Sequence, residues 1–219
     1  MENENLTLAT KQWNYEKAYK QAYKLACEQL AGIDDIEEQC RRSGAQYQPG
    51  DAGILIQYLN QSYLISLPGG EISLVGSAET VPIRDRILIL HYFNSAKGTP
   101  MANRLITLRE LPEGSGYFPT FFNRTSQPIL NNFGKEPKLL LGAAEKLGGL
   151  RVDYGDAAVT INAFSRVPIT IILWGGDDEL APQGNVVFDA SISDYLCTED
   201  IVVLCETITW KLIRNLQKA

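Results

Sequence analysis

The sequence predicts an α+β protein in which helices flank a mostly antiparallel sheet. Helix-like and strand-like segments are interspersed, without the regular strand–helix repeat that builds a parallel sheet. The two most apolar segments, residues 157–163 and 167–174, are joined by only a few residues, which makes them neighbouring antiparallel strands. A chain of 219 residues without a long linker can be organised by one core, so a single domain over residues 1–219 is expected.

A helical arm over about residues 10–42 is expected ahead of a sheet-containing body over about residues 51–219. Residues 10–30 repeat apolar side chains at helical spacing up to Gly32, and residues 34–40 add a short second helix. The stripe on the first helix consists of Tyr15, Tyr19, Ala22, Tyr23, Ala26 and Leu30. We interpret its tyrosines as packing surface, with a partner-binding face as the alternative.

Three short β-rich runs and a helix follow the arm. Residues 54–59, 63–67 and 71–75 are separated by turn-forming residues and predict a three-stranded meander. Residues 80–94 predict a helix with Thr80 as its N-cap, and this helix carries His91, the one histidine of the sequence. His91 is either a satisfied core or rim residue or an axial ligand or acid–base group.

The middle of the chain is rich in aromatic residues. Residues 104–111 predict a strand and residues 112–116 a loop, and residues 120–133 and 137–147 predict two helices. The aromatic residues of segment 117–122 are Tyr117, Phe118, Phe121 and Phe122. They either cap one end of the core or line a site for a flat apolar ligand.

The last quarter of the chain contains the central strands and a helix. Pro168 must lie at a strand start or a bulge, because it cannot donate to the ladder. Residues 174–179 form a turn loaded with carboxylates, and residues 186–188 predict a strand that ends at Asp189. Thr198 is the expected N-cap of the final helix, with Glu199 and Asp200 in the first turn, where the helix dipole favours negative charge.

Charge and composition argue against nucleic acid or a membrane as partner and against secretion. A net charge of -6 and a pI near 4.9 argue against nucleic acid or an anionic membrane surface, since both need clustered cations. No apolar run approaches the roughly 18 residues of a membrane helix, and the first residues lack a secretory signal, so a cytoplasmic protein is expected. The four cysteines have no CxxC spacing and are expected to be free thiols. Cys197 adjoins a predicted helix N-terminus, which acidifies a thiol, but two adjacent carboxylates oppose that effect.

Motifs for common chemistries are missing from the sequence. It contains no GxxxxGK[ST] or GxGxxG for a nucleotide and no GxSxG for serine hydrolysis. One histidine excludes a zinc site built from several histidines, and no metal site is predicted.

Carboxylates gather at the ends of the predicted central strands. They are Asp156, Asp177, Asp178, Glu179 and Asp189. If Asp156, Asp177, Glu179 and Asp189 converge, they form the active site of a carboxylate-dependent or metal-assisted hydrolase. The structural alternative makes the 177–179 segment a solvated turn. It also makes Asp156 a buried or half-buried acceptor or partner of Arg166, and Asp189 a cap or a partner of Arg166 or Arg109.

Nine short segments carry a family resemblance, namely residues 90–92, 108–112, 154–158, 164–168, 173–174, 176–179, 188–191, 195–196 and 198–200. Together they resemble a bacterial and archaeal family known as domain of unknown function 3786. The resemblance covers most of the chain from about Ile54 to the final helix. Some relatives are similar to iron–sulfur proteins because they carry a four-cysteine cluster domain that also occurs in corrinoid iron–sulfur proteins. That four-cysteine pattern is not in this sequence, so no cluster of its own is expected.

The resemblance implies anaerobic redox or corrinoid metabolism as a setting. With the aromatic segment and His91, it favours a cytoplasmic cofactor-binding module for a corrinoid or other tetrapyrrole such as haem, with a redox or corrinoid protein as its partner. The candidate binding residues are His91, Tyr117, Tyr154, Asp156, Arg166, Trp174, Asp177, Glu179 and Asp189. The carboxylate hydrolase and a structural, partner-binding protein are the two competing hypotheses, and the sequence leaves open whether the protein is an enzyme.

Overall fold

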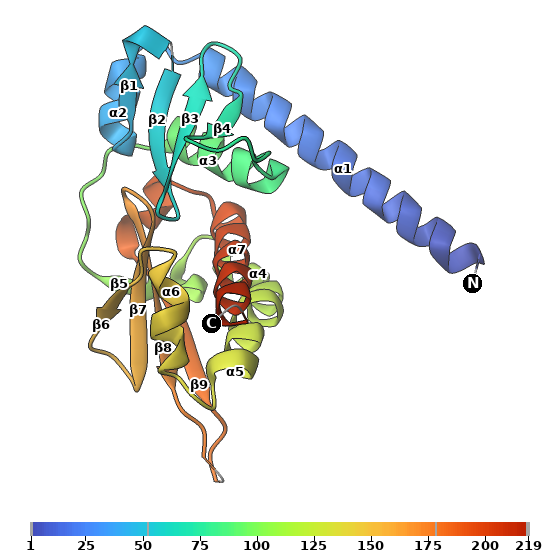
Figure 1. The fold of residues 1–219 in the computed structure, drawn as a ribbon, viewed down its shortest axis with the longest axis vertical. Coiled ribbons are helices and arrows are strands. Elements are labelled where there is room, and N and C mark those ends of the chain that lie inside the picture. Colours follow the sequence, from blue (N-terminus) through green and yellow to red (C-terminus); the bar gives the residue numbers. More distant parts are fainter. Residues whose placement is uncertain (1, 52, 178, 218–219) are drawn as a thin grey trace.

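Two antiparallel sheets, of four and five strands, confirm the predicted α+β class (Figure 1). The structure is a computed structural model and describes residues 2–51, 53–177 and 179–217. Helices flank both sheets, as expected. In the described part of the chain, no helix combines the length and apolarity needed to cross a membrane.

The first sheet is a meander in the order β1-β2-β3-β4. Its strands are β1 (Gln46–Gln48), β2 (Gly53–Tyr58), β3 (Gln61–Ser66) and β4 (Ile72–Leu74), with a short 3-10 helix over Pro49–Asp51. The hairpin between β2 and β3 has a two-residue loop in which Leu59 and Asn60 both have positive φ, the backbone form that matches strand twist. The predicted three strands are confirmed, and β1 is an additional strand at the edge.

Three helices accompany this sheet: α1 (Glu2–Ala31), α2 (Ile36–Ser43) and α3 (Ile83–Ser95). Asp35 caps α2 by accepting the backbone N–H of Glu38 at 2.8 Å, and left-handed Gly44 ends it. The predicted N-cap Thr80 is wrong, because α3 begins after Pro82, whose fixed φ suits a helix start.

The second sheet has the order β5-β9-β8-β7-β6, and every neighbouring pair is antiparallel. Its strands are β5 (Leu105–Thr107), β6 (Leu150–Val152), β7 (Ala157–Phe164), β8 (Val167–Trp174) and β9 (Gln183–Asp189). The antiparallel pairing of the two central strands is confirmed, and Pro168 lies at the start of β8 opposite a bulge.

Two predictions for the middle of the chain are wrong. The strand expected over residues 104–111 stops at Thr107, because Thr107 and Glu110 form a capping box that starts the 3-10 helix η2 (Leu108–Glu110). The loop expected over residues 112–116 is partly helical, since α4 (Gly114–Phe121), the π-helix η3 (Phe122–Ser126) and α5 (Gln127–Phe133) follow one another directly.

The remaining helices are α6 (Leu139–Glu145), the 3-10 helix η4 (Ala190–Asp194) and α7 (Thr198–Leu216). Cys197, not Thr198, is the N-cap residue of α7. Thr198 is the first helical residue, and its hydroxyl instead donates to the carbonyl of Pro112 at 2.6 Å. This bond ties the start of α7 to the loop before α4.

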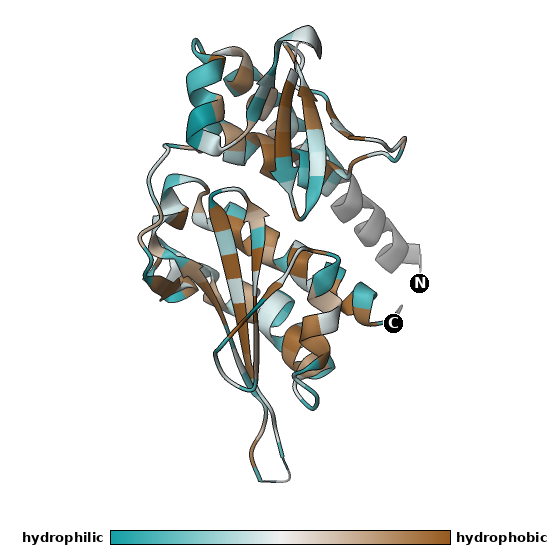
Figure 2. Cartoon of the chain, turned by 60° about the vertical axis from the view of Figure 1, so that its left-hand side comes forward, coloured by the Kyte–Doolittle hydropathy of each residue, from teal (hydrophilic) through white to brown (hydrophobic). Residues whose placement is uncertain are grey.

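One continuous core joins the two sheets. The ring of Tyr92 on α3 stacks on Phe164 of β7 with 4.0 Å between centroids, and Tyr58 of β2 lies 4.9 Å from the same ring. The backbone N–H of Leu59 donates to the carbonyl of Ala163 at 3.0 Å. Figure 2 shows apolar residues along the strands of both sheets and along the helices that pack against them.

Candidate functional site

The only histidine of the chain lies where α3 meets the start of α7. Nδ1 of His91 is 2.9 Å and 3.0 Å from the two carboxylate oxygens of Asp200. The thiol of Cys197 donates to the same carboxylate, at 3.1 Å from Oδ2. Asp200 therefore connects an imidazole on one helix with a thiol at the N-terminus of the other.

Charged pairs elsewhere hold these two helices together. Arg84 of α3 lies 2.9 Å from Glu206 of α7, and Lys211 of α7 lies 3.9 Å from Asp85 of α3. Asp85 is buried and also accepts a hydrogen bond from the hydroxyl of Tyr58 at 3.0 Å. These bridges fix the position of α3 over α7, and so they fix His91 over Asp200.

The protonation of the cluster follows from these contacts. The hydrogen bond to Asp200 raises the pKa of His91, outweighing the opposite effect of burial. Burial raises the pKa of the Cys197 thiol to about 11, and the Asp200 charge adds to the shift. The backbone N–H groups at the start of α7 act in the opposite direction but do not prevail. Cys197 is therefore a protonated thiol at neutral pH and not an activated nucleophile.

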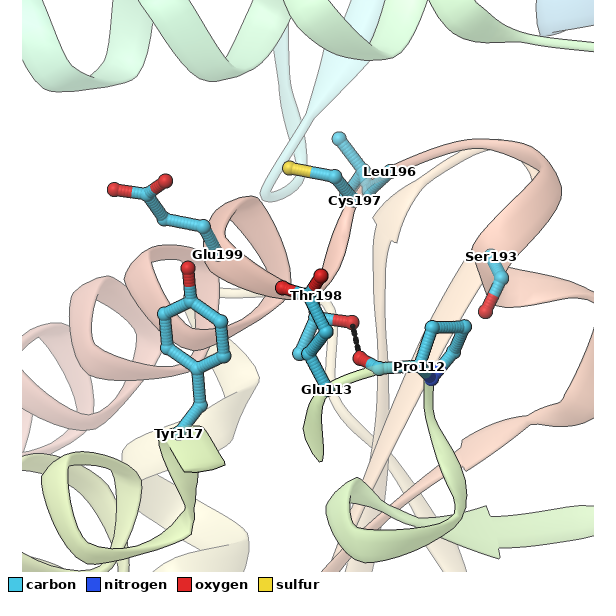
Figure 3. A pocket seen from close by; sticks show the side chains of 8 residues that line it. All are labelled: Pro112, Glu113, Tyr117, Ser193, Leu196, Cys197, Thr198 and Glu199. Atoms are coloured by element: carbon cyan, nitrogen blue, oxygen red, sulfur yellow. Dashed lines mark hydrogen bonds between the residues drawn. The ribbon is translucent and has the colours of Figure 1, made fainter. Parts of the chain in front are cut away.

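A cavity of about 390 Å³ opens beside this cluster (Figure 3). It is lined by Pro112, Glu113, Tyr117, Ser193, Leu196, Cys197, Thr198 and Glu199. Figure 3 shows the Tyr117 ring pointing from α4 toward the start of α7, and the charge of Glu199 raises the pKa of the Tyr117 phenol. The lining combines apolar surface with two carboxylates and contains no lysine or arginine, so it does not favour an anionic ligand.

His91 has the surroundings of a metal-binding imidazole. It is half-buried, and only Nδ1 has a hydrogen-bond partner among the described residues. Metal-binding histidines generally hold one ring nitrogen against a carboxylate or carbonyl while the other binds the metal. The Asp200 contact occupies Nδ1 and leaves Nε2 without a protein partner in the described part of the chain.

Five of the predicted site residues lie at the far end of the five-stranded sheet, away from His91. They are Tyr154, Asp156, Trp174, Asp177 and Glu179. Asp177 accepts the backbone N–H groups of Glu179 and Leu180 at 2.9 and 2.7 Å, which makes this segment a self-capped exposed turn. Asp178 lies outside the described residues.

Asp156 and Arg166 do not pair. Asp156 is exposed and accepts the backbone N–H of Gly175 at 2.7 Å, so the expectation of a buried or half-buried carboxylate is wrong, whereas the backbone contact is confirmed. In the β7–β8 hairpin Ala157 pairs with Leu173 and Phe164 with Val167, so Asp156 and Arg166 lie at opposite ends. The length of an eight-residue strand, about 26 Å, separates them.

Asp189 is a structural cap. It is 4% exposed and accepts hydrogen bonds from the backbone N–H of Ala102, the N–H of Ser191 and the Ser191 hydroxyl, at 2.9, 2.9 and 2.6 Å. Burial raises the pKa of this carboxyl, but these hydrogen bonds outweigh burial and lower it overall. Arg109, its other predicted partner, instead lies over the ring of Phe118 at 3.8 Å.

The carboxylates proposed for a hydrolase therefore occupy two separate places. Asp189 lies opposite Leu105 in the β5–β9 strand pairing, near the end of β8 that begins at the β7–β8 hairpin. Asp156 and Asp177 lie beyond the other end of β8. Among the described residues, no three histidine, cysteine or acidic side chains are arranged to hold a metal ion. The four acids do not form one centre.

The sequence did not identify Asp200, Glu113, Ser193 or Glu199 as members of a site with His91 and Tyr117. Asp200 and Glu199 were visible as acids in the first turn of a helix, a position with an ordinary structural explanation. Their meeting with α3 depends on packing between segments about a hundred residues apart, for which the sequence contains no local signal.

Comparison with known proteins gives one family match. The model of a family described as "Domain of unknown function (DUF3786)" matches residues 35–210, which is most of the chain. No curated protein and no solved structure matches the chain.

Proposed function

We propose that this chain, which belongs to the DUF3786 family by the match over residues 35–210, is a cytoplasmic cofactor-binding module that holds a corrinoid through His91. The observation that carries this proposal is the bond from Nδ1 of His91 to Asp200 at 2.9 Å, with Nε2 left without a protein partner in the described structure. The resemblance to relatives with a corrinoid setting supports the choice of cofactor.

The chemistry of the cavity favours a corrinoid over haem. A haem presents two anionic propionates, which need cations, and the lining contains Glu113 and Glu199 but no lysine or arginine. The periphery of a corrinoid carries neutral carboxamides, which donate hydrogen bonds to carboxylates and hydroxyls. The cavity of about 390 Å³ is smaller than a whole corrinoid, so it would take one edge of the macrocycle and leave the rest exposed.

Each residue of the site then has a specific role. Asp200 fixes the tautomer of His91 and leaves Nε2 available to a ligand, and Glu206 and Asp85 keep the two helices in register through their ion pairs. Tyr117 offers an aromatic edge to an apolar ring system, and the Cys197 thiol keeps its proton. A bound corrinoid would supply methyl-group or electron transfer at its cobalt.

The test is a titration of the purified protein with aquacobalamin and with diaquocobinamide, followed by absorbance and by calorimetry. We expect replacement of a cobalt-bound water by imidazole to shift the corrinoid spectrum. His91→Ala should abolish the shift, and Asp200→Asn should weaken binding about 10–100-fold, as loss of a carboxylate behind a metal-binding histidine does. Glu38→Gln, which removes an ion-paired carboxylate on α2, is the matched control and should bind normally.

Two results would overturn the proposal. One is the lack of both a spectral change and a heat of binding with the two corrinoids. The other is binding that is unchanged in His91→Ala, which would place the cofactor elsewhere. A response to haem alone would reject the corrinoid and retain a tetrapyrrole site.

A further inference from the structure

The N-terminal part of α1 projects from the rest of the molecule (Figure 1). Its described side chains join the core from Tyr23 onward, through Ala26 and Leu30, and none between Tyr15 and Ala22 belongs to the core. Tyr15 is 62% exposed. Helices of this length are marginal in water unless a face packs against something. Of the described side chains from Tyr15 to Ala22, only Tyr19 and Ala22 are half-buried, and the others are exposed.

The projecting part has a basic face. Lys17, Lys20 and Lys24 are spaced by three and four residues, which places them on one side of the helix. Lys24 also makes an exposed ion pair with Glu28, at 3.7 Å. The helix contains four lysines and four glutamates, so the chain outside it carries the whole net charge of -6.

A surface with more acids than cations lies at the far end of the five-stranded sheet, and we call it the acidic end. Its exposed acids are Asp153, Asp156, Asp177 and Glu179, and two exposed cations, Lys138 and Arg151, lie beside them. Three large apolar side chains share this end, namely Tyr154, Trp174 and Leu180, which are 50%, 40% and 68% exposed. Exposed aromatic residues next to complementary charge are typical of protein interfaces.

We propose that the basic face of α1 docks on the acidic end of a second copy of this chain, and that the two copies exchange these contacts reciprocally. The lysines face the acids, and Tyr15 packs with the apolar side chains of the acidic end. Reciprocal exchange gives a closed two-fold dimer in which the same contact is used twice. The proposal is independent of the cofactor site, which contains none of these residues.

The test measures the mass of the full chain by sedimentation equilibrium at 50 and 500 mM salt. We expect a dimer whose dissociation constant rises at least about tenfold at the higher salt, because the contact is between exposed charges. The double variant Lys20→Glu/Lys24→Glu should be monomeric, and so should Asp153→Lys/Glu179→Lys. Arg104→Glu/Lys146→Glu changes the net charge equally at exposed positions outside both surfaces and should remain dimeric.

Mixing the two monomeric variants gives the sharpest result. Each variant supplies the charge that the other has lost, so the mixture should recover a heterodimer. Carbodiimide cross-linking of mixed ¹⁴N- and ¹⁵N-labelled wild-type protein should join Lys20 or Lys24 of one copy to carboxylates of the acidic end of the other. Circular dichroism confirms that each variant is folded.

A wild-type monomer at 100 µM in low salt would overturn the proposal. So would a dimer that survives Lys20→Glu/Lys24→Glu, a mixture that stays monomeric, or a mass that grows beyond two copies.

Discussion

Removing the buried carboxylate of Asp189 should destabilise the protein more than removing any exposed acid. In Asp189→Ala the N–H and hydroxyl of buried Ser191 lose their acceptor, whereas the exposed N–H of Ala102 can turn to water. An unsatisfied buried donor costs about 1–3 kcal/mol, and the hydroxyl can partly reorient, so we expect a loss of about 2–4 kcal/mol.

The matched control is Asp156→Asn. Asp156 is exposed and accepts one backbone hydrogen bond, so its loss should cost no more than about 1 kcal/mol. Urea unfolding followed by tryptophan fluorescence gives the free energy of unfolding for both variants and the wild type. If the midpoint of Asp189→Ala equals that of the wild type, Asp189 is not the cap that we describe.

The stabilisation by the Asp189 carboxylate should be lost at acid pH. The pKa of Asp189 is lowered in the folded state, so its carboxylate stabilises the protein above the unfolded pKa of about 3.9. That contribution is lost as the pH falls through the folded pKa. The stability difference between wild type and Asp189→Asn should therefore be constant near neutral pH and shrink below about pH 4.

Three further predictions concern other parts of the molecule. The raised pKa of His91 means that its bond to Asp200 stabilises the protein below the unfolded pKa of about 6.5 and ceases to do so as the pH rises through the folded pKa. The stability difference between wild type and His91→Gln in urea should therefore decrease with rising pH, and a difference that increases would contradict it. Phe164→Ala should cost about 3–5 kcal/mol, because this ring joins the two sheets, and circular dichroism and fluorescence should still report one unfolding transition; two separate transitions would reject the single domain. Maleimide should label exposed Cys197 before the buried thiols, at a rate that rises with pH toward 11, and a rate that levels off near pH 7 would show a thiolate that we do not expect.

The sequence predicted those parts of the fold that have a strong local pattern. The apolar run of β8 was predicted over residues 167–174, and the structure gives the same bounds. The edge strands β1 and β6 were missed because each has three residues, mostly exposed, and exists only through pairing with a distant neighbour. Register also explains the failed pairing of Asp156 with Arg166, since a hairpin places its two ends a full strand length apart.

The candidate site was predicted in part. His91 and Tyr117 could be chosen because a single histidine and an aromatic segment are visible in the sequence, and both lie near the start of α7. The sequence shows that the acids lie at the ends of strands. It does not show at which end of the sheet each acid lies. That information resides in strand order, which no local pattern contains.

The most direct test of the cofactor proposal uses the fact that His91 is the only histidine of the chain. Cob(II)inamide, which has no nitrogen base of its own, is added to protein labelled with either ¹⁴N- or ¹⁵N-histidine, and the electron paramagnetic resonance spectrum is recorded. If Nε2 of His91 binds the cobalt, each cobalt line should split into three with ¹⁴N and into two with ¹⁵N, because the two nuclei have spins of 1 and 1/2. A spectrum without nitrogen splitting, or one that is the same with both labels, would contradict ligation by His91.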